Sequence, residues 1–143
     1  MISVSDSIRV DASVEDTFAF LDDPHNHAAV TPRLTDVRDV ERLPNGGKRL
    51  SYTYRMAGVG VDGELIQRRH EPNERMAFEM CGGLEGEIDL RFAPHDDGGT
   101  ELTYAAEYEL PGSVLSVVAA PVARRFNERQ LRATLRNVAA EFE

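Results

Sequence analysis

The densest group of potentially reactive side chains is the run Asp22-Asp23-Pro24-His25-Asn26-His27, which holds two carboxylates and two imidazoles in six residues. Carboxylates and imidazoles are common metal ligands. The run falls, however, where we expect two short helices to meet, and a His-x-His pair points both rings in one direction on a strand but not on a helix. We therefore expect neither a metal site nor a cofactor, and interpret the run as a helix junction.

Glu128 is the second candidate for chemistry, and it stands beside Asn127 on an expected long C-terminal helix. Apolar residues of this helix recur at steps of four, three and four, which is one face of a 3.6-residue repeat: Leu131, Leu135, Val138 and Phe142. Toward the N-terminus the same face falls on polar Arg124, Asn127 and Glu128. A helix face that turns polar where it should be buried indicates a cavity rather than a solid core.

A buried Glu128 would need a partner, because burying an unpaired carboxylate is costly. We expect it either to meet a tyrosine from the strands or to have a raised pKa. Tyr52, Tyr54 and Tyr104 are the plausible partners, since Arg55 has the opposite strand parity. Alternatively, rotation of the helix places Glu128 in solvent at the cavity rim.

The remaining chemical candidates are weaker. His70 ends an expected strand beside Glu71, which favours a surface ion pair. The sequence has no meaningful Ser-His-Asp spacing, no phosphate-binding loop and no dinucleotide fingerprint.

The length of 143 residues predicts a single domain spanning residues 1–143, large enough to bury a core. No apolar run approaches the roughly 18 residues that span a bilayer. Residues 1–4 lack the basic and then apolar build of a signal peptide. The single cysteine, Cys81, excludes an intramolecular disulfide, so a cytoplasmic location is expected.

The net charge of −9 argues against nucleic acid as a partner, because nucleic-acid binders normally present a basic patch to phosphates. Arginines do cluster at residues 124–136, but we interpret them as a solvated helix face. Lys48 is the only lysine. An acidic, lysine-poor chain suits a high-salt cytoplasm, and genomic base composition explains the missing lysines equally well. A homodimer is an open possibility.

The elements that must position these residues begin with a strand at residues 2–10, where apolar and polar side chains largely alternate. Ser13 is placed to cap a helix, with Asp16 at the capping-box position. Pro24 can open a second short helix, where its missing N–H has no helical partner anyway.

Between residues 33 and 110 the pattern is strand, turn, strand, with turns at 44–47, 71–73, 82–83 and 95–99 and a bend at Gly58 and Gly60. Such spacing indicates an antiparallel meander. The final helix is expected at 113–142, with a kink at Pro121, because proline removes a backbone donor and clashes with the preceding turn.

Carboxylates share one face of the last two expected strands: Glu85, Glu87, Asp89, Glu101, Glu107 and Glu109. Like charges across an antiparallel pair repel each other. This face must therefore be solvated, the apolar face must point inward, and salt should stabilise the fold by screening.

The order of elements, together with short motifs, resembles the START-like, helix-grip superfamily, also called SRPBCC or polyketide cyclase/dehydrase-like. The motifs are SIRV at 7–10, VEDTF at 14–18, LDDP at 21–24, GGT at 98–100 and YELPG at 108–112. The resemblance covers essentially the whole chain. It implies an α+β fold in which a curved antiparallel sheet of six or seven strands wraps a long C-terminal helix, with two short helices between the first two strands.

The resemblance also implies a deep, mostly apolar cavity between the sheet and the C-terminal helix. Strand alternation and the helix face agree, and the expected lining is Tyr52, Tyr54, Met56, Leu65, Phe78, Met80, Ile88, Leu90, Tyr104, Tyr108, Asn127, Glu128 and Leu131. The apolar members of this set would equally suit an ordinary close-packed core.

Members of the superfamily bind lipids, sterols, hormones and polyketides, and some cyclise polyketides, so fold alone does not give function. We favour binding of a small hydrophobic or lipid-like molecule. A cyclase or dehydratase is the alternative, with Glu128 or a cavity tyrosine moving protons. A protein-interaction module without a ligand is the third reading. A titratable pair within hydrogen-bond reach inside the cavity would favour the enzyme.

Overall fold

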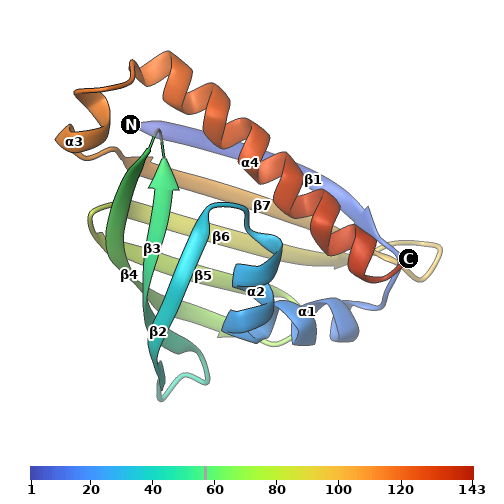
Figure 1. The fold of residues 1–143 in the computed structure, drawn as a ribbon. Helices are drawn as coiled ribbons and strands as arrows, with labels where there is room; N and C mark the ends of the chain where they lie inside the picture. Colours follow the sequence, from blue (N-terminus) through green and yellow to red (C-terminus); the bar gives the residue numbers. More distant parts are fainter. Residues whose placement is uncertain (57) are drawn as a thin grey trace.

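Seven antiparallel strands form one sheet, in the order β1-β7-β6-β5-β4-β3-β2 from edge to edge. The computed structural model describes residues 1–56 and 58–143. The strands are β1 (Ile2–Val10), β2 (Leu34–Arg42), β3 (Lys48–Met56), β4 (Val59–Glu71), β5 (Arg75–Gly82), β6 (Glu85–Pro94) and β7 (Thr100–Glu109). The helices are α1 (Val14–Asp22), α2 (Pro24–Val30), α3 (Gly112–Leu115) and α4 (Ala120–Glu141). The sheet curves around α4, with α1 and α2 between β1 and β2, so the expected α+β fold is confirmed (Figure 1).

Strand alternation decides which side chains the concave face receives. On β3, Leu50, Tyr52 and Met56 are buried, whereas Arg49 and Arg55 on the opposite face are exposed. Successive strand residues point to opposite sides of a sheet, so one period-two pattern separates the core from the solvent. The turns predicted at 44–47, 71–73, 82–83 and 95–99 lie at strand connections, whereas Gly60 of the predicted bend lies within β4.

The caps of α1 and α2 fix the register of both short helices. Ser13 Oγ accepts a hydrogen bond from the Asp16 N–H at 3.1 Å. The Asp23 carboxylate accepts one from the His25 N–H at 2.9 Å, and Pro24 is the first residue of α2. Both predicted helix starts are confirmed, and they place His27 in the last turn of α2.

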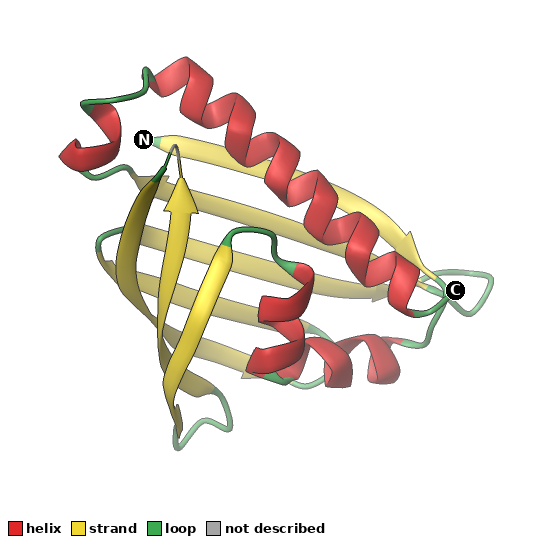
Figure 2. Ribbon diagram, in the orientation of Figure 1, coloured by secondary structure: helices red, strands yellow, loops and turns green. Residues whose placement is uncertain are grey.

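The C-terminal helix is shorter than predicted. The expected single helix at 113–142 with a kink at Pro121 is wrong, because α3 ends at Leu115 and α4 starts at Ala120. Pro121 lies in the first turn of α4, where a proline suits a helix start instead of bending an interior turn. α4 packs mainly along β1 (Figure 2). None of the helices described is long and apolar enough to cross a membrane.

The convex face of the sheet carries the predicted carboxylates. Glu79, Glu87 and Glu107 are cross-strand neighbours on β5, β6 and β7, and Glu85 pairs with Glu109. Glu87, Glu107, Glu85 and Glu109 are all exposed, so the prediction of a solvated acidic face is confirmed.

Candidate ligand-binding site

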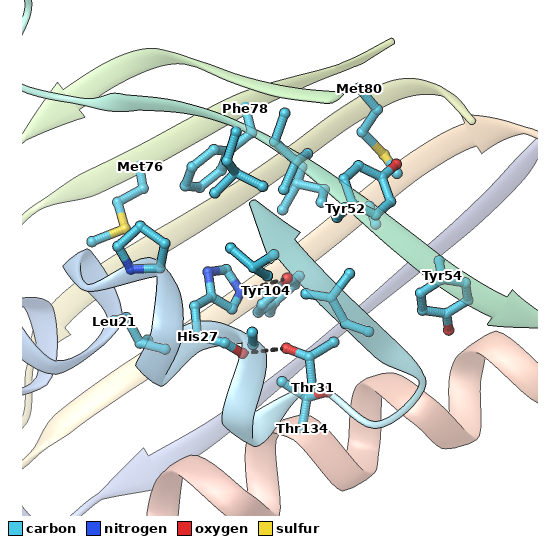
Figure 3. Close-up of a pocket in the computed structure, with 18 of the residues that line it drawn as sticks. Leu21, His27, Thr31, Tyr52, Tyr54, Met76, Phe78, Met80, Tyr104 and Thr134 are labelled. Carbon is cyan, nitrogen blue, oxygen red and sulfur yellow. Dashed lines mark hydrogen bonds between the residues drawn. The ribbon is translucent and has the colours of Figure 1, made fainter. Parts of the chain in front are cut away.

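A cavity of about 120 Å³ lies between the concave face of the sheet, α2 and α4. Figure 3 shows side chains from these elements projecting into one shared space. Ten of the thirteen residues expected to line it do so: Tyr52, Tyr54, Leu65, Phe78, Met80, Ile88, Tyr104, Tyr108, Asn127 and Leu131. An apolar void only slightly larger, about 150 Å³, is enough to take a benzene-sized molecule.

Three expected lining residues do not border the cavity: Met56, Leu90 and Glu128. Met56 is the last residue of β3 and is 2% exposed, and Leu90 on β6 is fully buried. Both belong to solid core. α1 packs on β6, the strand that carries Leu90.

Glu128 is exposed, so the expectation that it points toward the sheet is wrong. It lies in a shallow surface depression with Arg124 and Arg125. Ala123 and Thr134 are buried on α4 together with Asn127. The buried face of the helix is therefore centred closer to Asn127 than the apolar pattern of the sequence predicted. Glu128 falls on the opposite flank of that face, because neighbouring helix residues are about 100° apart.

His27 and Tyr104 form the titratable pair inside the cavity. His27 Nε2 lies 3.0 Å from the Tyr104 hydroxyl, and both side chains line the space (Figure 3). Thr31 donates a hydrogen bond to the His27 carbonyl at 2.6 Å, and Asn137 of α4 donates one to the Val30 carbonyl at 3.0 Å. The first bond closes the C-terminal end of α2, and the second joins α2 to α4. Together they hold the helix in place, and with it the His27 imidazole.

The environment keeps His27 neutral. Burial lowers its pKa to about 4, because the charged form loses its hydration. His27 is half-buried and lines the cavity. Burial also raises the pKa of Tyr104. The pair is therefore a neutral imidazole and a protonated phenol at pH 7.

Tyr54 and Asn127 form a second polar contact, between β3 and α4. The Tyr54 hydroxyl donates to Asn127 Oδ1 at 3.4 Å, and Asn127 Nδ2 donates to the Ala123 carbonyl at 2.8 Å. Burial raises the pKa of Tyr54 to about 12, against the opposing effect of Arg33. Asn127 is thus confirmed as a polar helix residue that faces the sheet.

Tyr52 packs over a glycine. A Cβ atom at Gly63, its cross-strand partner on β4, would lie 2.9 Å from the Tyr52 hydroxyl. Gly63 therefore makes room for the ring. Burial raises the pKa of Tyr52 and of Tyr108, so both phenols stay protonated and able to donate.

Charged groups gather at the end of the cavity where β3 begins. Asp22 Oδ1 lies 3.0 Å from His70 Nε2 and 3.6 Å from Lys48 Nζ. His70 is largely buried against Phe18, with ring centroids 5.4 Å apart. The predicted surface ion pair of His70 with Glu71 is therefore wrong, because β4 places His70 beside the α1–α2 junction.

Sequence reasoning missed the roles of His27, Lys48 and Gln67 in the lining. The sequence pattern presents His27 only as a candidate metal ligand at a helix junction, and it does not reveal that the second short helix borders the cavity. Lys48 and Gln67 share the strand parity of Leu50 and Leu65, and that parity was the signal that could have found them.

Chemically, the cavity offers neutral hydrogen-bonding groups in apolar walls, with one ion pair at its β3 end. It can enclose an apolar molecule and orient a few polar atoms. The His27–Tyr104 pair could also pass a proton between nitrogen, oxygen and a bound molecule.

Solved structures with the same fold include the START superfamily protein from Mycobacterium smegmatis, with a TM-score of 0.77, 16% identity and coverage of 98% of this chain and 96% of that chain. The conserved protein from Geobacillus kaustophilus has a TM-score of 0.79 at 14% identity, covering 99% and 95%. The Zhui aromatase/cyclase from Streptomyces sp. R1128 has a TM-score of 0.74 at 18% identity, covering 97% and 92%. At these identities the likeness shows the fold.

A search of the curated proteins finds no match for the sequence. The model of one protein family, described as polyketide cyclase / dehydrase and lipid transport, matches residues 1–143. Together with the START-like architecture and the enclosed cavity, this match over the whole chain shows that the protein belongs to the polyketide cyclase/dehydrase and lipid transport family.

Proposed function

We propose that the protein binds a small hydrophobic or lipid-like molecule in the cavity between the sheet and α4. The observation that carries the proposal is the space of about 120 Å³ lined mainly by apolar and aromatic side chains with a few polar groups. This composition is typical of small-molecule sites. Lipid transport in the family description supports the same ligand class.

Indole, a small neutral aromatic dye whose fluorescence shifts in apolar surroundings, tests the proposal, and the chain has no tryptophan to interfere. Ala106 of β7 lines the cavity, whereas the neighbouring Ala105 lies on the other face of the same strand. We expect Ala106→Phe to fill the cavity and weaken dye binding about tenfold or more, which is a loss of roughly 1.4 kcal/mol. Ala105→Phe, the matched control, should bind like the wild type.

Native mass spectrometry of the protein purified from its own host complements the dye titration, because a co-purifying small molecule would identify the ligand class. A folded wild-type protein that binds no dye contradicts the proposal and favours a protein-interaction module. Equal loss of binding in both phenylalanine variants would place the dye outside the cavity.

Proton transfer is the second candidate function, and the His27–Tyr104 contact of 3.0 Å favours it. Geometry of this kind suits a general acid and base in a cyclase or dehydratase. The test is hydrogen–deuterium exchange at the methyl group of acetophenone, followed by NMR. Catalysis predicts faster exchange with the wild type than with His27→Gln or Tyr104→Phe. Equal rates leave the cavity as a binding site only.

A further inference from the structure

At the β3 end of the cavity, the buried side-chain amide of Gln67 uses only its oxygen for hydrogen bonding within the described part of the chain. Gln67 of β4 lines the cavity and is 3% exposed. Its Oε1 accepts the Lys48 N–H at 3.0 Å. Its Nε2 is buried without a hydrogen-bond partner among residues 1–56 and 58–143. Because Oε1 is held by a main-chain donor, reversing the amide would break that bond, so the NH₂ group is the free side.

The surrounding backbone holds this amide in place. A Cβ atom at Gly47 would lie 2.8 Å from three side-chain carbons of Gln67, so the glycine gives the side chain its space. Asn45 Nδ2 donates to the main-chain carbonyl of Gln67 at 2.9 Å. The free N–H groups are therefore presented at a fixed place, which is what a recognition group requires.

The neighbouring groups leave donors in excess. Lys48 Nζ donates to the Asp22 carbonyl at 2.9 Å and lies 3.6 Å from Asp22 Oδ1. That same Oδ1 is in hydrogen-bond contact with His70 Nε2. Lys48 and Asp22 also cancel each other in charge. What remains for a bound molecule is a set of N–H donors in surroundings without net charge from this ion pair.

We propose that Gln67 and Lys48, with Asp22 as the counter-charge of Lys48, form an acceptor subsite, in which N–H donors receive a neutral acceptor oxygen at one end of an otherwise apolar ligand. The ligand class is a hydrophobic molecule that ends in the carbonyl group of a ketone, aldehyde or ester. This inference rests on the proposed binding function and specifies it. A hydrocarbon would leave the buried Gln67 N–H groups unpaired. A carboxylate would bring a second negative charge beside Asp22.

Competition against indole tests the acceptor subsite with three medium-chain probes of equal length. They are a methyl ketone, the alkene isostere in which a methylene group replaces the carbonyl oxygen, and the carboxylic acid. Gln67→Met removes the donor. Gln67→Glu keeps an acceptor for the Lys48 N–H but replaces the free donor with an acceptor, and it serves where Gln67→Met does not fold.

We expect both variants to weaken ketone binding about fivefold, the value of one net hydrogen bond, and to leave alkene binding unchanged. Comparing the ketone with its isostere in each protein cancels their different hydration. Arg68→Met is the matched control, since Arg68 follows Gln67 on β4 and is exposed. It should change neither affinity.

Equal weakening of ketone and alkene binding would overturn the inference, because Gln67 would then only shape the wall. Tighter binding of the acid than of the ketone by the wild type would overturn it in favour of an anion site. In both cases indole still binds and the proposed function stands. Absence of indole binding by the folded wild type defeats the proposed function itself.

Discussion

His27 brings an ionisable ring into a space lined mainly by carbon, and its protonation depends on that environment. Its pKa of about 4 lies below the ordinary value of 6.5. Between these two values the unfolded chain binds a proton that the folded protein does not. Stability must therefore be complete above about pH 6.5 and fall as the pH decreases toward 4.

The expected size of this loss is about 2 kcal/mol between pH 7 and pH 5, from a slope of at most about 1.4 kcal/mol per pH unit. Urea unfolding of the wild type and of His27→Gln at both pH values measures it. Because other titrating groups are common to the two proteins, the difference between them isolates His27. A variant that loses as much stability as the wild type on acidification would contradict a neutral buried imidazole.

At the residue level, the sequence predicted the strand part of the site better than the helix part. A strand has two faces, so parity assigned Tyr52, Tyr54 and Tyr104 to the cavity side. A helix has a continuous surface, and the sequence placed both Asn127 and Glu128 on the sheet side, although only Asn127 lies there. Gln67 has the parity of Leu65, which would have assigned it to the lining, but its unpartnered amide depends on the contact with Lys48, which no local pattern reveals.

Among the elements, turn and cap residues predicted the strands and short helices because each acts within a few residues. The final helix was misjudged at its start, since Pro121 fits either a kinked interior or a first turn. In the structure, residues 116–119 are not helical and Ala119 is the N-cap of α4, so Pro121 lies in a first turn.

The strands β5, β6 and β7 hold a row of three carboxylates that should lower their stability. Glu87 lies between Glu79 and Glu107, and Glu79 is partly neutralised by Arg68 at 3.2 Å. We expect Glu87→Gln to raise the free energy of unfolding by about 0.5 kcal/mol at low salt, through lost cross-strand repulsion. Urea denaturation at low and at molar KCl measures the gain, which screening should remove at high salt.

Glu41→Gln is the matched control for Glu87→Gln. Glu41 is an exposed strand residue on β2, and it pairs with Arg49 instead of another carboxylate. The same substitution should not stabilise the protein there. A gain of similar size at both positions would assign the effect to glutamine itself and not to the acidic row.

The molecule as a whole carries a net charge of −9, and much of this charge lies on the convex face of one sheet. Mutual repulsion of like charges opposes the compact state and weakens as salt screens it. The interpretation that the acidic, lysine-poor composition suits a high-salt cytoplasm stays a prediction. It concerns the whole protein rather than any one residue.

We expect the melting temperature to rise by several degrees as KCl increases from about 0.1 M toward 1 M, which shortens the Debye length from about 10 Å to 3 Å. Differential scanning calorimetry across that series measures it. A melting temperature that is flat or falls would contradict adaptation to a salty interior and leave base composition as the explanation for the single lysine.

The pairing of the first strand with the last has a consequence for the order in which the chain assembles. Ile2 pairs with Tyr108, so β1 leaves the ribosome more than a hundred residues before its partner. Closing so long a loop costs entropy that only the finished interface compensates, whereas the hairpins from β2 to β7 can form locally. α4, which supplies Asn127 and Leu131, is synthesised later still. A guest molecule can therefore be enclosed only once translation of α4 is complete.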